Sequence, residues 1–171
     1  MADDIVEFHA ARLMLLMHLC GVRGRINGLT KMAKLDFFVR YPDFFASAQA
    51  SETSDAENPE NHSHDEQVES AMVRHHYGPW DKRYYHILAH LEAKGLISIS
   101  KSGKSYQIAL TEFGAEKAKA LGKLNSFSQL VGHMREVKRV FGGKSGSYLK
   151  DLIYRLFDEE VGKRPMGEKI D

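Results

Sequence analysis

The segment from Tyr77 to Gly114, YGPWDKRYYHILAHLEAKGLISISKSGKSYQIALTEFG, constrains the fold more than any other part of the chain. Asp81 is a candidate N-cap and Gly95 a candidate C-terminal glycine, so the segment predicts a helix that reaches Lys94. Alternating apolar residues on either side of a Lys-Ser-Gly-Lys turn then predict a β-hairpin. Thr111 is expected to cap the helix that follows. This order of elements is typical of a winged helix-turn-helix, in which the hairpin is the wing.

Apolar residues recur at helical spacing through most of the remaining chain. Further helices are expected from Asp3 or Asp4 to Gly21, from Leu29 to Tyr41, from Glu112 to Phe141 with a break near Asn125, and from Tyr148 to Glu160. Shorter connections are expected as a turn over GVRGRING (21–28), a turn after Pro42 holding Phe44 and Phe45, and an amphipathic piece over 68–77. The expected fold is mainly α (α+β): a winged helix-turn-helix core with a two-stranded wing and a C-terminal helical extension.

The chain divides by composition into five regions. These are N-terminal helices of the winged-helix domain (1–50), an acidic loop (51–67), the helix-turn-helix and wing (68–114), C-terminal helices (115–160) and a polar tail (161–171). The loop holds six acidic residues and no Lys or Arg, so we expect it to be flexible. It is either a plain solvated insertion or an acidic arm that shields the basic half or docks a partner.

Charge is unevenly distributed behind a formal net value of +1. Residues 1–67 carry six Lys or Arg against eleven Asp or Glu, and residues 68–171 carry eighteen against twelve. The balance argues against a heavily basic nucleic-acid binder, but a local basic face remains compatible with it. Cys20 is the single cysteine, which excludes an internal disulfide and a Cys-based zinc site. An acidic N-terminus and the lack of a long apolar run predict a cytoplasmic protein with no membrane contact.

Several short motifs resemble phosphate-binding or zinc-binding sequences but lack residues that such sites require. The GGKS at 142–145 and the SGKS at 102–105 both lack the first glycine of a phosphate-binding loop. A predicted helix precedes the first where a strand is needed, and the second is a predicted hairpin turn. His86 and His90 have a zinc-binding spacing, but the residue between them that would act as a base in a metalloprotease is Ile87, and no third ligand follows. Cys20 is expected to be a buried small hydrophobe and Asp36 part of an ion pair. The sequence therefore predicts no enzyme activity, no catalytic residue, no metal and no cofactor.

Aromatic and basic residues at the start of the predicted helix are candidates for binding. Tyr84, Leu88 and Leu91 share one face and are expected in the core. Trp80, Arg83 and Tyr85 are either core residues or anchors at a protein interface, where Trp, Tyr and Arg contribute most. If the chain binds DNA, the expected contacts are Lys82, Arg83, His86 and the wing residues Lys101 and Lys104.

Three stretches together resemble the middle component of bacterial ABC-three-component systems of the Lamassu type. They are GLTKMAKLDFFVRYPDFF (28–45), MVRHHYGPWDKRYYHILAHLEAKGLI (72–97) and FGGKSGSYLKDLIYRLFDEE (141–160). The resemblance implies a non-enzymatic winged-helix subunit of an antiphage defence complex. Such a subunit is encoded beside an SMC-like or Rad50-like ABC ATPase and an effector, often a nuclease, and would bridge the two until foreign DNA is sensed. The shared KLDFF-RYP segment adds Arg40 and Tyr41 to the partner-interface candidates.

Two other functions stay open. One is a stand-alone winged-helix transcriptional regulator, a homodimer that binds DNA through the predicted helix and wing. Against it, that helix has few basic groups and no Asn or Gln to read base edges. The other is an antitoxin-like module, because the YGP and LEAKGLI segments also occur in such domains.

Overall fold

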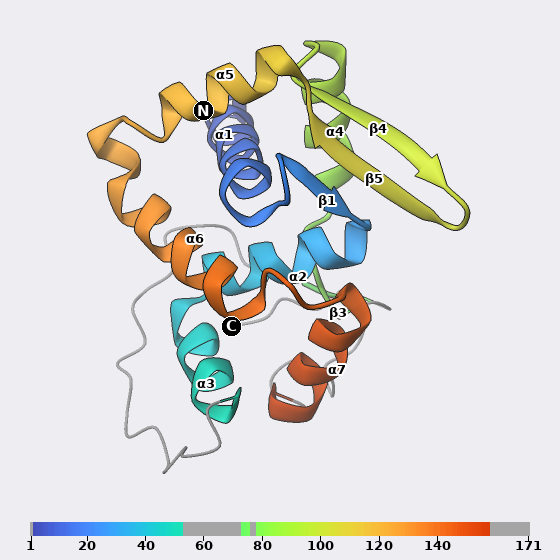
Figure 1. The fold of residues 1–171 in the computed structure, drawn as a ribbon, viewed down its shortest axis with the longest axis vertical. Coiled ribbons are helices and arrows are strands. Elements are labelled where there is room, and N and C mark those ends of the chain that lie inside the picture. Colours follow the sequence, from blue (N-terminus) through green and yellow to red (C-terminus); the bar gives the residue numbers. More distant parts are fainter. Residues whose placement is uncertain (1, 53–72, 76–77, 158–171) are drawn as a thin grey trace.

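The computed structural model describes residues 2–52, 73–75 and 78–157 (Figure 1). Its helices are α1 (Ala2–Cys20), α2 (Leu29–Arg40), α3 (Pro42–Glu52), α4 (Tyr84–Ala93), α5 (Glu112–Leu121), the 3-10 turn η1 (Asn125–Phe127), α6 (Ser128–Phe141) and α7 (Gly146–Phe157). Its strands are β1 (Arg25–Asn27), β2 (Val73–His75), β3 (Gly78–Trp80), β4 (Ile97–Ser102) and β5 (Ser105–Leu110). The expectation of a mainly helical protein with a small β part is confirmed.

Three strands form an antiparallel sheet in the order β1-β5-β4. The β4–β5 hairpin turns at Gly103, whose φ of +63° a glycine adopts without strain. β1 joins this hairpin from far away in the sequence, with Ile26 opposite Ile108. Ile26, Ile97 and Ile108 are all buried, so one side of the sheet packs on the core. β2 and β3 form a separate two-stranded ribbon.

α2 lies across the middle of the molecule, between α1 and the sheet on one side and α3 and α7 on the other (Figure 1). Every residue from Met32 to Arg40 is buried, so this helix has no solvent face over that stretch. A helix buried on all sides has to satisfy its polar side chains inside the protein. α2 carries three of them there: Lys34, Asp36 and Arg40.

Lysines from neighbouring elements bind the ends of two helices. Lys138 in α6 donates to the carbonyl oxygens of Cys20 and Gly21, at 3.2 and 3.0 Å, where α1 ends. Lys31 in α2 donates to the carbonyl oxygen of Gly142, at 2.8 Å, where α6 ends. A cation at a helix C-terminus satisfies carbonyls that have no partner within the helix and is favoured by the helix dipole. The C-terminal helices are thereby tied to the N-terminal ones.

The local predictions around the hairpin are confirmed. Gly95 follows α4 with φ of +73°, and the Thr111 hydroxyl accepts a hydrogen bond from the Gly114 amide at 3.0 Å at the start of α5. The predicted break between α5 and α6 lies at residues 122–127. Asp81, however, is not the N-cap of α4. The helix begins at Tyr84, and Asp81 precedes it in a turn, where its carboxylate accepts from the Arg83 amide at 2.9 Å.

Three connections differ from the expectation. Pro42 begins a helix, α3, where a short turn was expected, because proline is well suited to the first helical position, which needs no amide donor. The expected turn at 21–28 contains β1, and the expected amphipathic piece at 68–77 contains β2. Both strands have three residues, too few to show an alternating pattern.

One of the region limits expected from the sequence can be compared with the observed helices. α3 extends to Glu52, so the limit expected at residue 50 falls inside a helix. The remainder of the acidic segment, residues 53–67, and the tail at 161–171 lie outside the described residues.

No helix within 2–52, 73–75 and 78–157 is both long and apolar enough to cross a lipid bilayer.

Candidate functional site

The residues predicted to bind a partner divide into buried and exposed sets. Trp80, Arg40 and Tyr41 are only 3–5% exposed, so they offer almost no surface to another protein. Trp80 packs edge-on against Tyr84, with ring centroids 5.2 Å apart. Arg83 keeps about a third of its side chain exposed, and Tyr85 is 62% exposed. Of the five, only Arg83 and Tyr85 are therefore accessible to a partner, and the other three belong to the interior.

The residues predicted to contact DNA lie on two adjacent elements. Lys82 and His86 are exposed at the start of α4, and Lys101 and Lys104 are exposed on the hairpin. The Lys101 ammonium lies 5.9 Å from the ring centroid of Tyr106, an aromatic residue that is 42% exposed. Arg83 differs from the other four because its guanidinium is bound to Asp81. The five side chains therefore lie on α4, in the turn before it and on the β4–β5 hairpin, and none of them is buried.

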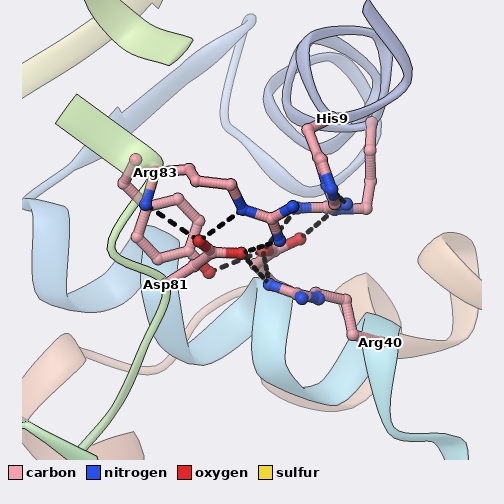
Figure 2. A network of polar contacts seen from close by, with 7 residues as sticks. His9, Arg40, Asp81 and Arg83 are labelled. Atoms are coloured by element: carbon pink, nitrogen blue, oxygen red, sulfur yellow. Dashed lines mark hydrogen bonds and ion pairs between the residues drawn. The ribbon is translucent and has the colours of Figure 1, made fainter. Parts of the chain in front are cut away.

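Behind this surface lies a network of seven polar residues, which Figure 2 shows at close range. Asp36 is its first centre. The carboxylate accepts two hydrogen bonds from Arg12 of α1, at 2.8 and 3.2 Å, and one from the Tyr84 hydroxyl of α4, at 2.6 Å. All three side chains are fully buried. One carboxylate therefore connects three helices, and the ion pair expected for Asp36 is confirmed with a partner 24 residues away.

Asp81 is the second centre. Its carboxylate accepts from Arg40 of α2 at 2.7 Å and from the Arg83 guanidinium at 2.9 and 2.6 Å. Arg40 also lies 3.8 Å from Asp36, so it joins the two centres. Charged groups away from water are tolerated when they are paired and hydrogen-bonded, as these are. The turn before α4 is in this way fixed to the buried helix α2.

Three residues of the network, His9, Asp81 and Tyr84, have pKa values shifted away from their usual ranges. Burial, together with the charge of Arg12, lowers the pKa of His9 to about 4, so its Nδ1 is free of a proton and accepts from Arg12. Burial alone would raise the pKa of Asp81, but the hydrogen bonds of Arg83 and the charge of Arg40 keep that pKa well below its usual range. Burial and the charge of Asp36 raise the pKa of Tyr84 well above 10. The groups are thus suited to holding elements together rather than to proton transfer at neutral pH.

Sequence reasoning missed most of this network because its contacts are non-local. Only Asp36 had been singled out as half of an ion pair, and Arg12 and His9 had not been considered. One signal was present: Arg12 comes directly before the apolar run Leu13–Met17, where a charged side chain has to find a buried partner. The identity of that partner depends on how α1 packs on α2, which no local pattern contains.

The exposed residues predicted for binding thus lie on α4, in the turn before it and on the β4–β5 hairpin. Within the described part of the chain, no three His, Cys, Asp or Glu side chains lie close enough together to hold a metal ion. Comparisons of the chain with protein-family models, with curated proteins and with solved structures gave no match.

Proposed function

We propose that the chain is a winged-helix protein that acts as a non-catalytic binding subunit. The strand order supports the fold: β1 follows α1 directly and pairs with the hairpin that follows α4, in the order β1-β5-β4. A short strand after the first helix pairs with the wing in the same way in winged helices. α1, α2 and α4 are then the three helices of the core, and α3 with the residues up to 80 is an insertion between the second and third.

The exposed stripe of α4 is the observation that carries the proposal. Its buried side consists of Tyr84, Ile87, Leu88 and Leu91. Its exposed side holds Tyr85, His86 and Ala89, and Lys82 in the turn before it continues this face at the same three- and four-residue spacing. Tyr85 gives this face a large exposed aromatic ring, a residue type that is enriched at the centre of protein interfaces. We therefore assign binding to this face together with the wing.

The resemblance to Lamassu-type middle components supports the choice of partner. Two of the three stretches that carry it, 28–45 and 72–97, meet in the buried network: Asp36 and Arg40 come from the first, and Asp81, Arg83 and Tyr84 from the second. Residues that are far apart in the sequence thus belong to one structural unit. The resemblance gives the partner as an SMC-like ABC ATPase of the same operon. The subunit would bridge it to an effector in the cytoplasm.

Co-expression with the neighbouring genes tests this function. The tagged full chain is expected to co-purify with an ABC ATPase, and Tyr85→Ala should lower the amount of co-purified ATPase by about tenfold or more. Leu124→Ala is the matched control, because Leu124 is also an exposed apolar residue, at 49%, but lies far along the chain before α6. If no ATPase co-purifies, or if both variants behave alike, the proposal fails.

DNA binding is the second candidate, favoured by the exposure of Lys82, His86, Lys101 and Lys104. A regulator would bind as a homodimer and prefer its own upstream DNA to random duplex at a stated salt concentration. The double variant Lys101→Ala/Lys104→Ala should then weaken binding and reduce the slope of log affinity against log salt by about two. The double variant Lys119→Ala/Lys123→Ala removes the same charge from outside this surface and should leave binding unchanged. Equal affinity for both duplexes would exclude the regulator.

A further inference from the structure

An apolar groove of about 510 Å³ lies between α1, α4 and α5, beside the proposed α4 stripe but lined by other residues. Ala10 and Ala11 on α1 have small side chains, which leaves space for the groove. Met14, Leu91 and Leu121 also line it. The groove opens to solvent on one side. Helices present such hollows where small residues allow a partner's larger side chains to approach closely. The groove thus has the size and the lining to receive several apolar side chains.

Its rim carries an exposed aromatic ring and more positive than negative charge. Phe113, in the first turn of α5, is 50% exposed, and the Lys117 ammonium lies 5.4 Å from its ring centroid. Lys94, at the end of α4, is exposed on another part of the rim. The remaining ionisable side chains of the lining are His90 and Glu7. Two lysines against one glutamate make the rim complementary to an acidic ligand.

We infer that this groove binds an amphipathic, acidic helix of a protein partner. Its apolar face would lie along Ala11 and Phe113, and carboxylates beside that face would pair with Lys94 and Lys117. An open groove walled by helices and rimmed by charge fits this mode of recognition, in which apolar anchors recur every three or four residues. The inference deepens the proposed function, since it describes the partner segment, but it concerns a different surface from Tyr85 and the wing.

The test is a selection of displayed helical peptides on the full chain, followed by affinity measurement with labelled peptides. Peptides are expected to emerge with apolar residues at three- and four-residue spacing and with Asp or Glu beside them. Phe113→Ala and the double variant Lys94→Glu/Lys117→Glu should each weaken binding by about tenfold or more. The double variant Lys119→Glu/Lys123→Glu makes the same change of charge outside the groove and should have no effect. Circular dichroism would establish that each variant is folded.

Three results would overturn the inference. The first is that no enriched peptide distinguishes the native chain from Phe113→Ala, or that the enriched peptides are basic. The second is that dodecanoate displaces the peptides at micromolar concentration, because the groove would then be a site for apolar carboxylates. The third is a native dimer that Phe113→Ala converts to a monomer, because a second copy would then occupy the groove. None of these results depends on an ATPase co-purifying with the chain, so this inference and the proposed function can fail separately.

Discussion

Asp36 and Asp81 are the residues on which most of the polar interior depends. Each carboxylate is hydrogen-bonded to side chains from other elements, and Arg40 lies beside both. Removing one partner from a buried ion pair leaves the other charge without compensation in a medium that solvates it poorly. The cost of changing any one residue here is therefore set by the groups that are left behind, more than by the contact that is lost.

Asp36→Asn is expected to lower the free energy of unfolding by about 3–5 kcal/mol, because Arg12 and Arg40 lose a buried counter-charge. Tyr84→Phe should cost less, about 1.5–3 kcal/mol, because it removes one hydrogen bond to a charged group and leaves the arginines paired. Urea unfolding at pH 7 measures both. Asp151→Asn, an exposed acid on α7, is the control. The account is wrong if Asp36→Asn costs no more than this control.

The pKa of His9 predicts a loss of stability on mild acidification. Its pKa is about 4 in the folded chain and about 6.5 when unfolded, so between these values the unfolded state binds the extra proton. Stability therefore falls as pH decreases from about 6.5 to about 4, by about 2–3 kcal/mol from this residue.

His9→Asn isolates this contribution. The amide oxygen can accept the hydrogen bond from Arg12 but does not take up a proton, so the variant should lose less stability than the native chain between pH 7 and pH 4.5. Urea unfolding at several pH values gives the two slopes. Identical slopes would show that His9 is not buried and neutral in the folded state.

At the scale of elements, the sequence predicted best what local chemistry determines. The hairpin, the glycine after α4, the Thr111 cap and the break between α5 and α6 each follow from a few neighbouring residues. β1 and β2 could not be predicted, because strands of three residues carry no period and acquire their identity from a partner. The network could not be predicted either, because its residues come from α1, α2, α4 and the turn before α4, and their contacts depend on how these elements pack. The interface candidates Trp80, Arg40 and Tyr41 are buried. The sequence could not predict this, because residue type alone does not separate a core aromatic or arginine from an exposed one.

Gly114 fixes how α5 approaches the sheet. A Cβ atom at this position would lie 1.8 Å from the carbonyl oxygen of Leu96, which is backbone and cannot rotate away. Gly114→Ala should therefore displace α5 and cost about 1–3 kcal/mol. Gly132→Ala is the matched change within α6, where nothing lies near the new atom, and it should stabilise the chain by about 0.5–1 kcal/mol. Thermal unfolding distinguishes the two, and equal shifts in Tm would contradict the close packing of α5 on the backbone of Leu96, just before β4.

At the scale of the whole molecule, the near-zero net charge does not show that parts of the surface differ in composition. The buried network joins α1, α2 and the start of α4, and the capping lysines Lys31 and Lys138 join α6 to α2 and α1. The two surfaces proposed for partners are the α4 stripe with the β4–β5 hairpin, and the groove between α1, α4 and α5. Their composition differs, since the first is polar with Tyr85 exposed and the second is apolar with a basic rim. A protein with two such faces is suited to connecting two other chains.

Hydrogen–deuterium exchange of the full chain, alone and in the complex isolated by co-expression with the neighbouring genes, tests the central claim most directly. Amide exchange in α4 and in the β4–β5 hairpin should slow markedly when the ATPase is bound, because these elements carry the proposed surface. Amides on the outer side of α7 serve as the internal reference and should exchange unchanged. Protection confined to α6 and α7, with α4 and the hairpin unaffected, would show that the chain does not bind its partner through the surface formed by α4 and the hairpin.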